Sequence, residues 1–216
     1  MKDRKMSFYN RILKRILDII CSLAAIVCLS VLYLPICAII KCTSEGPVFF
    51  RQKRIGKNKK YFNILKFRTM RIDTPKDCPT HLLKNPEQYI TKVGVFLRKT
   101  SLDELPQIFN IFKGDMSVIG PRPALWNQDD LISERDKYGA NDVRPGLTGW
   151  AQINGRDELP IPVKAKLDGE YAEKISFWFD VKCLFLTIAS VVKSDGVVEG
   201  GTGQMSEKEI SEKVDK

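Results

Sequence analysis

The sequence is poor in the residues that build thiolate or imidazole metal sites. It holds one histidine, His81, and six cysteines, none of them in a C-x-x-C pair. Three of the cysteines, Cys21, Cys28 and Cys37, lie inside one long apolar run. These features count against a disulfide framework and against a zinc site, and they favour a reducing compartment.

Charge is absent from another part of the chain, because no charged residue occurs between Ile19 and Ile40. At a rise of about 1.5 Å per residue, a helix of this run could span roughly 30 Å of hydrocarbon. The run is too long for a signal peptide and lacks a small-residue cleavage site. The sequence therefore predicts a membrane-anchoring helix, which we place in residues 1–42.

Two features bear on whether this helix crosses the membrane or enters and returns. Basic residues lie on both flanks, six in residues 2–15 and seven in residues 41–60. A spanning helix would leave one of these blocks on the outer face, against the positive-inside tendency. Pro35 lies within the run, donates no backbone hydrogen bond and collides with the carbonyl of Val31, so the helix should kink or break. Composition leaves a re-entrant and a spanning helix open, and we expect the re-entrant one.

The rest of the chain predicts one small α/β domain at residues 43–200, built from short strands and amphipathic helices. With 216 residues, 44% of them apolar, the chain can bury one core. The net charge of +9 indicates an anionic partner: a nucleic acid, an anionic lipid or a phosphorylated substrate. Residues 201–216 are charged and poor in apolar side chains, and we expect a disordered tail.

A predicted hairpin contributes the first candidate cations. Residues 48–52 and 61–70 are typical of strands, with a basic loop between them. Lys66 and Arg68 lie two residues apart and should project from one strand face. A solvated basic surface explains this pair as well as a binding role does.

The most informative stretch follows at residues 98–123. Asp103 and Glu104 are adjacent acids at the head of an apolar helical run. Arg98 lies just upstream, and Arg122 occupies a rigid Gly-Pro-Arg-Pro turn downstream. A carboxylate pair flanked by fixed cations can bring an anionic nucleophile to an anionic phosphate.

A purely structural role competes for one of these acids. Ser101 and Glu104 match the S-x-x-E capping box, in which both side chains satisfy backbone donors at a helix start. Asp103 has no role in that box, although any acid near a helix start gains from the dipole. The residues alone leave both interpretations of Glu104 open.

Taken together, these segments resemble the bacterial sugar transferase family, the small monotopic polyprenyl-phosphate phosphoglycosyl transferases. The resemblance covers residues 14–193, and larger members of the family carry a further multi-span N-terminal region. The family often has Ser-Pro at the helix break, where this chain has Leu34-Pro35. Its most specific motifs are Lys66-Phe-Arg-Thr-Met70, Ser101-Leu-Asp-Glu-Leu105, Lys113-Gly-Asp-Met-Ser117, Gly120-Pro-Arg-Pro123 and the Gly-rich residues 144–156.

The resemblance implies transfer of a sugar-1-phosphate from a UDP-sugar to undecaprenyl phosphate, with release of UMP, through a covalent phosphosugar-aspartate intermediate. Asp103 would be the nucleophile, and Glu104 would hold Mg²⁺ on the diphosphate. The enzyme would face the cytoplasm from the bacterial inner membrane and begin capsule, O-antigen or glycoprotein glycan synthesis. The implied substrate-binding residues are Lys66, Arg98, Arg122, Arg144, Gln152, Arg156, Asp168 and Asp180, with Arg144 to Arg156 on the uridine side.

Two other classes of function remain as alternatives. A membrane-associated glycosyltransferase would use the acids as base or metal ligands and release UDP. A non-enzymatic, membrane-tethered basic module would bind anionic lipid or nucleic acid, but paired acids beside the arginines do not suit a polyanion-binding face. We therefore expect UDP-sugar, undecaprenyl phosphate and membrane lipid as partners and no nucleic acid, and leave open a homodimer and the identity of the sugar.

Overall fold

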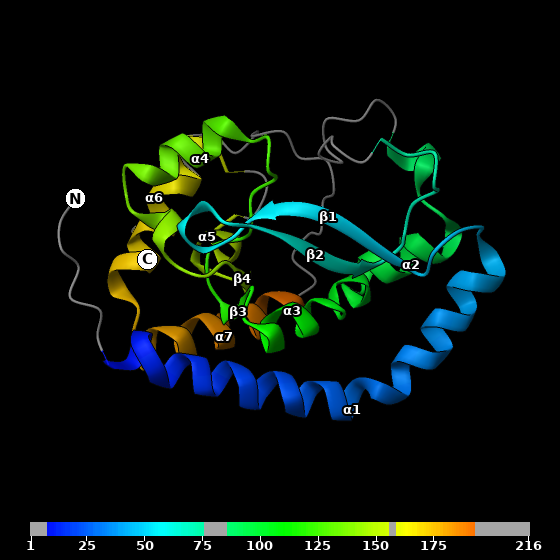
Figure 1. Cartoon of the computed structure of the whole chain (residues 1–216), viewed down its shortest axis with the longest axis horizontal. Helices are drawn as coiled ribbons and strands as arrows, with labels where there is room; N and C mark the ends of the chain where they lie inside the picture. The colour runs from blue at the N-terminus through cyan, green and yellow to red at the C-terminus, as the bar shows by residue number, and fades with distance from the viewer. Residues whose placement is uncertain (1–7, 76–85, 156–158, 193–216) are drawn as a thin grey trace.

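Along the chain, one long N-terminal helix is followed by a domain of helices and short strands (Figure 1). The computed structural model describes residues 8–75, 86–155 and 159–192. The helices are α1 (Lys14–Thr43), α2 (Lys92–Lys99), α3 (Gln107–Lys113), α4 (Asp129–Asp136), α5 (Trp150–Ile153), α6 (Ile161–Lys174) and α7 (Phe177–Val192). The strands are β1 (Phe49–Ile55), β2 (Tyr61–Phe67), β3 (Ser117–Ile119) and β4 (Gly146–Thr148). Short helical turns are η1 (Tyr9–Leu13), η2 (Lys57–Lys59), η4 (Pro86–Tyr89), η5 (Leu102–Glu104) and η6 (Ala140–Asp142). The predicted mixture of helix and strand is thus confirmed, and the predicted tail at 201–216 lies outside the described residues.

Helix α1 continues through Pro35 and bends instead of breaking (Figure 1). A proline removes one backbone hydrogen bond and crowds the preceding turn, which a helix held by packing at both ends can absorb as a bend. Together with η1, α1 forms a helix over Tyr9–Thr43 that is long and apolar enough to cross a membrane.

Both arms of α1 pack against the same domain. At its start, Arg15 donates to the carbonyls of Ile111 and Phe112, at 2.6 and 2.7 Å. Past the middle, the Tyr33 hydroxyl donates to the Leu105 carbonyl at 2.9 Å. Buried Ile36 and Ile40 at the far end share one core cluster with Phe67 and Leu97.

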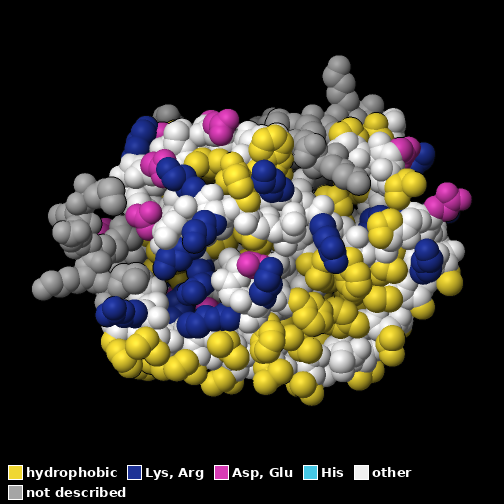
Figure 2. Space-filling view, in the orientation of Figure 1, with side chains coloured by type: hydrophobic (Ala, Val, Ile, Leu, Met, Phe, Trp, Pro, Cys, Tyr) yellow, Lys and Arg dark blue, Asp and Glu magenta, His cyan; other side chains and the backbone are white. Residues whose placement is uncertain are grey.

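The outward surface of α1 and of the helices beside it, α3 and α7, is apolar. Figure 2 shows hydrophobic side chains gathered along the edge where α1 lies. Val31 and Leu34 of α1 are 76% and 79% exposed, and Trp178 of α7 is 77% exposed. Other exposed members are Ile16, Ile20, Leu23 and Val27 of α1, Phe109 and Phe112 of α3, and Leu184, Phe185 and Ile188 of α7. Since soluble monomers rarely expose so much apolar surface, this surface needs a non-aqueous neighbour.

Two separate two-stranded sheets position the polar residues. β1 and β2 form an antiparallel hairpin that pairs Phe50 with Lys66 and Ile55 with Tyr61. β3 and β4 run parallel, with Ser117 opposite Gly146 and Ile119 opposite Thr148. β2 ends at Phe67, so the predicted strand 61–70 is too long. Arg68, beyond it, is buried and donates to the carbonyls of Ser44 and Glu45 instead of sharing a strand face with Lys66.

Candidate active site

The acidic pair lies in η5, a short 3₁₀ turn between α2 and α3. Ser101 precedes the turn with a left-handed φ of 56° and makes no side-chain capping bond. The capping box is therefore not formed. The Glu104 carboxylate instead accepts from Lys66 Nζ at 2.7 Å and from Arg122 Nη2 at 3.1 Å, both on Oε1.

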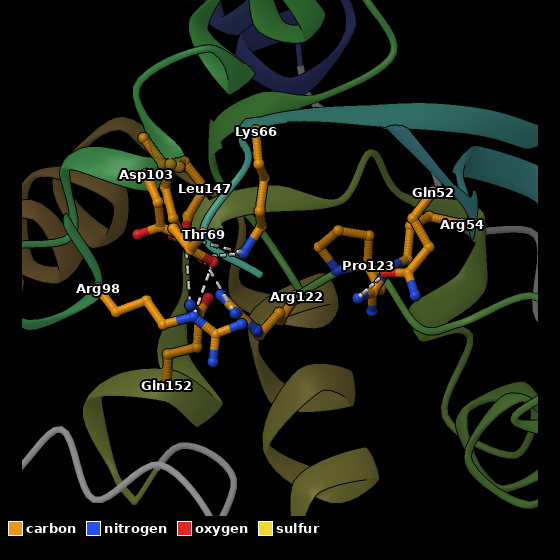
Figure 3. Close-up of polar contacts among 11 residues, drawn as sticks. Gln52, Arg54, Lys66, Thr69, Arg98, Asp103, Arg122, Pro123, Leu147 and Gln152 are labelled. Atoms are coloured by element: carbon orange, nitrogen blue, oxygen red, sulfur yellow. Dashed lines mark hydrogen bonds and ion pairs between the residues drawn. The ribbon is translucent and has the colours of Figure 1, made fainter. Parts of the chain in front are cut away.

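Lys66 contacts both acids, and Figure 3 shows its side chain on the same side as Asp103. Its Nζ lies 3.9 Å from Asp103 Oδ2, against 2.7 Å from Glu104 Oε1. Lys66 projects from the end of β2, whereas Asp103 and Glu104 come from η5. Hairpin and turn thus bring together charges that are nearly forty residues apart in the sequence.

Two more predicted residues, Arg98 and Gln152, are drawn with Asp103 in Figure 3, and the charge of Arg98 acts to lower the pKa of the Asp103 carboxyl. Arg98, at the end of α2, donates from Nε to Thr69 Oγ1 at 2.8 Å. Gln152, in α5, donates from Nε2 to the Leu147 carbonyl at 3.3 Å. Its Oε1 is buried and has no hydrogen-bond partner among the described residues. Thr69, which fixes Arg98, was missed by sequence reasoning because a threonine after a strand carries no chemical signal of its own.

The surroundings shift the pKa values of the two acids in opposite directions. Burial raises the pKa of Asp103 above its ordinary value, and the nearby charge of Lys66 opposes this only in part. Burial also acts to raise the pKa of Glu104, but Lys66 and Arg122 outweigh it and hold that pKa well below its usual range. Glu104 is therefore held ionised, while Asp103 is the more basic carboxylate of the pair.

This difference predicts how activity depends on pH. If Asp103 must be ionised to react, activity should fall as pH drops through its raised pKa. Lys66 is the largest charge that lowers this pKa, so Lys66→Met should move the acid limb of kcat/KM to higher pH. Lys60→Met, an exposed lysine on the same hairpin, is the control and should leave the limb in place. An unmoved limb in Lys66→Met contradicts the assignment.

The loop that carries Arg122 is held through its backbone. Arg135 Nη2 donates to the Arg122 carbonyl and Arg54 Nη1 to the Pro123 carbonyl, each at 3.0 Å. Arg135 is itself bound to Asp168, with Nη2 and Nε at 2.5 and 2.8 Å from Oδ2. Sequence reasoning missed Arg54 and Arg135, since nothing distinguishes them locally from other basic residues. These contacts fix the backbone position from which the Arg122 side chain extends.

The other predicted binding residues that the structure describes, Arg144, Asp168 and Asp180, make their contacts elsewhere in the domain. Asp168 is engaged by Arg135, and Asp180 accepts from Lys14 at 2.6 Å and from Tyr171 at 2.7 Å. Arg144 donates from Nε to the Gly114 carbonyl at 3.2 Å. Their direct contact with substrate stays a prediction, and Arg156 lies outside the described residues.

The buried Asp168–Arg135 pair leads to a prediction about stability. Asp168→Asn leaves the Arg135 guanidinium, only 4% exposed, without its counter-charge. We expect a loss of about 3–5 kcal/mol in the free energy of unfolding, measured by denaturation in detergent. Lys59→Gln, which breaks an exposed ion pair with Asp136, should cost less than about 1 kcal/mol. Equal losses in the two variants would contradict a structural role for the buried pair.

The carboxylates of Asp103 and Glu104 could supply part of the ligand set of a hard divalent cation. Among the described residues no group of three or more His, Cys, Asp or Glu side chains is arranged to hold a metal. Adjacent carboxylates beside a phosphate site still fit Mg²⁺, which takes one or two protein carboxylates together with phosphate oxygens and water. Glu104, held ionised, is the residue that would supply such an oxygen.

Comparison with known proteins points to one family. A family model described as bacterial sugar transferase matches residues 9–194. The chain is 41% identical over 186 residues to "Uncharacterized sugar transferase EpsL" of Bacillus subtilis, covering 86% of this chain and 90% of that protein. It is 40% identical over 193 residues to the UDP-glucose:undecaprenyl-phosphate glucose-1-phosphate transferase of Escherichia coli, covering 86% of this chain and 41% of that protein. It is also 36% identical over 197 residues to exopolysaccharide production protein ExoY of Rhizobium meliloti, covering 85% and 87%.

Proposed function

Since the chain belongs to the bacterial sugar transferase family, we propose that it transfers a sugar-1-phosphate from a UDP-sugar to undecaprenyl phosphate and releases UMP. The observation that carries this proposal is the acidic pair of buried Asp103 and half-buried Glu104, in which Lys66 contacts both carboxylates and Arg122 contacts Glu104. The names of the E. coli relative and of an undecaprenyl-phosphate glucose phosphotransferase from Komagataeibacter xylinus support the acceptor. The name of ExoY supports a place in polysaccharide synthesis.

In the first step, a carboxylate oxygen of Asp103 attacks the phosphorus that bears the sugar. The bond from this phosphorus to the bridging oxygen breaks, and UMP leaves with the electron pair. Asp103 suits this role better than Glu104, because its pKa is raised and its contact with Lys66 is the longer one. Lys66 and Arg122 lie where charge moves between phosphate oxygens, and such fixed donors lower the barrier.

In the second step, a phosphate oxygen of undecaprenyl phosphate attacks the same phosphorus in the phosphosugar-aspartate. The bond to Asp103 breaks, its carboxylate is restored, and undecaprenyl-diphosphate-sugar leaves. Bound Mg²⁺ would offset the charge of the donor diphosphate, with Glu104 as its protein ligand. Arg98 and Arg122 are the residues we assign to the phosphate oxygens, because guanidinium groups match them in a planar fork.

The nucleotide product tests this proposal. The purified protein is incubated with undecaprenyl phosphate, Mg²⁺ and a panel of UDP-sugars, and the nucleotides are separated. Release of UMP with at least one donor is expected. Release of UDP instead would support the glycosyltransferase alternative, and no release with any donor, from protein that is folded and lipid-bound, would support a non-enzymatic membrane module.

We also propose that α1 is re-entrant and that the active site faces the cytoplasm, where UDP-sugars are made. A straight helix of 30 residues would be about 45 Å long and would carry its ends to opposite faces. The contacts of Arg15 near its start and of Ile40 near its end with one domain support a helix that bends back. The apolar surface of α1, α3 and α7 would then lie within one leaflet.

This topology predicts that both flanks of α1 are shielded from the outside. In a cysteine-free background, cysteines placed at position 2 and at exposed Lys60 should resist an impermeant thiol reagent in intact spheroplasts. Both should react once the membrane is permeabilised, which serves as the control. Labelling of either site in intact spheroplasts means that α1 spans the membrane.

A further inference from the structure

A small polar cavity lies at the far end of both sheets from Asp103. It opens beside η2, at the turn of the hairpin, whereas Lys66 lies at the other end of β2. From Tyr61 to Lys66 the strand covers about 16 Å, at about 3.3 Å per residue. Arg144 and Ser117, which line the cavity, also stand at the starts of β4 and β3, whereas Arg122 follows β3. The cavity is thus separate from the acidic pair.

Burial divides the cavity into a floor and a rim. Lys14, Asp18 and Ser117 are buried and form the floor, while Lys57 and Arg144 are half-buried and stand at the rim. About 20 Å³ is open to the centre of a water-sized group, which is room for one hydroxyl, ammonium or water. The floor can therefore admit only the tip of a larger ligand.

The rim favours an anion. Burial and then the nearby charge of Arg144 lower the pKa of Lys57, and the charge of Asp142 opposes this only in part, so the two cations stand close enough to repel each other. Neither forms an ion pair within 4.0 Å in the part of the chain that the structure describes, although exposed Asp142 also lines the cavity. A phosphate between the two cations would relieve their repulsion.

The floor needs a hydrogen-bond donor. Asp18 is 3% exposed, and its Oδ1 accepts from Ser117 Oγ at 3.0 Å and from the Val118 amide at 2.9 Å. Its Oδ2 is buried and has no hydrogen-bond partner among the described residues. The neighbouring Lys14 ammonium is bound by Asp180 at 2.6 Å. A buried carboxylate oxygen without a donor is costly, so a ligand that brings one is favoured.

The cavity also borders the apolar surface. Asn10, Lys14 and Asp18 come from the helix whose outward residues Ile12 and Ile16 are 45% and 46% exposed. Figure 2 shows Lys and Arg side chains gathered around a hollow on this side of the molecule, directly above the apolar edge. If that edge lies in the membrane, the cavity lies at the depth of lipid headgroups.

We propose that this cavity binds the headgroup of a membrane phospholipid, with its phosphodiester between Lys57 and Arg144 and a headgroup hydroxyl or ammonium on Asp18 Oδ2. The proposal rests on the membrane position proposed above, but not on the chemistry of Asp103. The bond from Arg144 to Gly114 at the end of α3 is a structural role for that arginine. That bond accounts neither for Lys57 nor for the unpartnered oxygen of Asp18.

The experiment counts retained lipids by native mass spectrometry. The full chain is exchanged into micelles that hold equal amounts of phosphatidylglycerol, phosphatidylethanolamine and phosphatidylcholine with matched acyl chains. The first two headgroups carry a donor, and the third carries none. We expect about tenfold preferential retention of the first two, the size of a lost charge-assisted hydrogen bond. Lys57→Gln should lower the retention of the first two lipids, because their phosphodiester loses one of its two cations, and Lys60→Gln, an exposed lysine near the same turn, should leave their retention unchanged.

Three results would overturn the site. Equal retention of phosphatidylcholine means that Asp18 holds only water. If Lys57→Gln and Lys60→Gln lower lipid retention equally, the lipid is held by diffuse attraction to the basic surface and not by this cavity. Displacement of the lipid by an equal concentration of inorganic phosphate means a site for soluble phosphate. UMP release is measured on the same preparations, so loss of the proposed reaction with the lipid preference intact, or the reverse, separates the two proposals.

Discussion

Asp103→Asn is expected to reduce UMP release by about 10³-fold or more, the scale seen when a catalytic nucleophile is removed. The amide keeps the shape of the side chain but lacks the charge and nucleophilicity to form the phosphosugar intermediate. Because burial already raises the pKa of Asp103, a neutral side chain is tolerated there and the fold should survive. The loss should therefore be chemical rather than structural.

Two measurements distinguish Asp103, the proposed nucleophile, from its neighbour Glu104. Mass spectrometry of the protein with a UDP-sugar alone should detect a phosphosugar adduct in the wild type and none in Asp103→Asn. Glu104→Gln should also fail, with a loss that depends on the Mg²⁺ concentration. Asp73→Asn, at an exposed acid paired with Arg71, is the matched control and should behave as wild type. Near-normal turnover in Asp103→Asn would remove Asp103 from the mechanism and leave Glu104 as the candidate acid.

Much of this site could be predicted because its residues are distinctive in sequence. Asp103 and Glu104 are adjacent, and Arg122 stands between two prolines, so type and spacing already indicated phosphate chemistry. The capping box was the competing interpretation, and the pattern alone could not decide it. The left-handed φ of Ser101 removes that interpretation, because it turns the backbone before η5 and leaves Glu104 facing Lys66.

Proximity in the sequence was a poorer guide to which residues lie close together in the structure. Arg144 and Gln152 belong to one motif, but β4 runs between them and carries them to different places. The glycines of this motif make the parallel pair possible. A Cβ on Gly149 would lie 2.0 Å from the carbonyl oxygen of Gly120, so backbone meets backbone there. Which end of a short strand a residue occupies depends on such contacts and not on local pattern.

Long-range pairing was the least predictable part. Asp168 and Asp180 look alike in sequence, as acids on amphipathic helices. Their partners, Arg135 and Lys14, are 33 and 166 residues away. Tertiary packing decides which charges are buried together, so an acid carried over from a motif can be one that positions another residue. Asp168 is linked to the candidate site through Arg135, which donates to the Arg122 carbonyl.

The second large effect is expected at Arg122, where Arg122→Lys should lower turnover by about one to three orders of magnitude. Lysine keeps the charge but loses the planar fork that binds two phosphate oxygens at once. The backbone here is fixed by two flanking prolines and by bonds from Arg135 and Arg54, so the guanidinium starts from a defined place. Removing one such preorganised donor typically costs a factor of this size.

The comparison that isolates geometry from charge is a second arginine-to-lysine change. Arg71→Lys alters an exposed arginine paired with Asp73 and should leave turnover, fold and membrane association at wild-type values. Arg122→Lys should match it in thermal stability and membrane association and differ only in turnover. Full activity in Arg122→Lys would show that Arg122 supplies only positive potential. The bidentate contact would then have to come from Arg98, whose Nε is already oriented by Thr69.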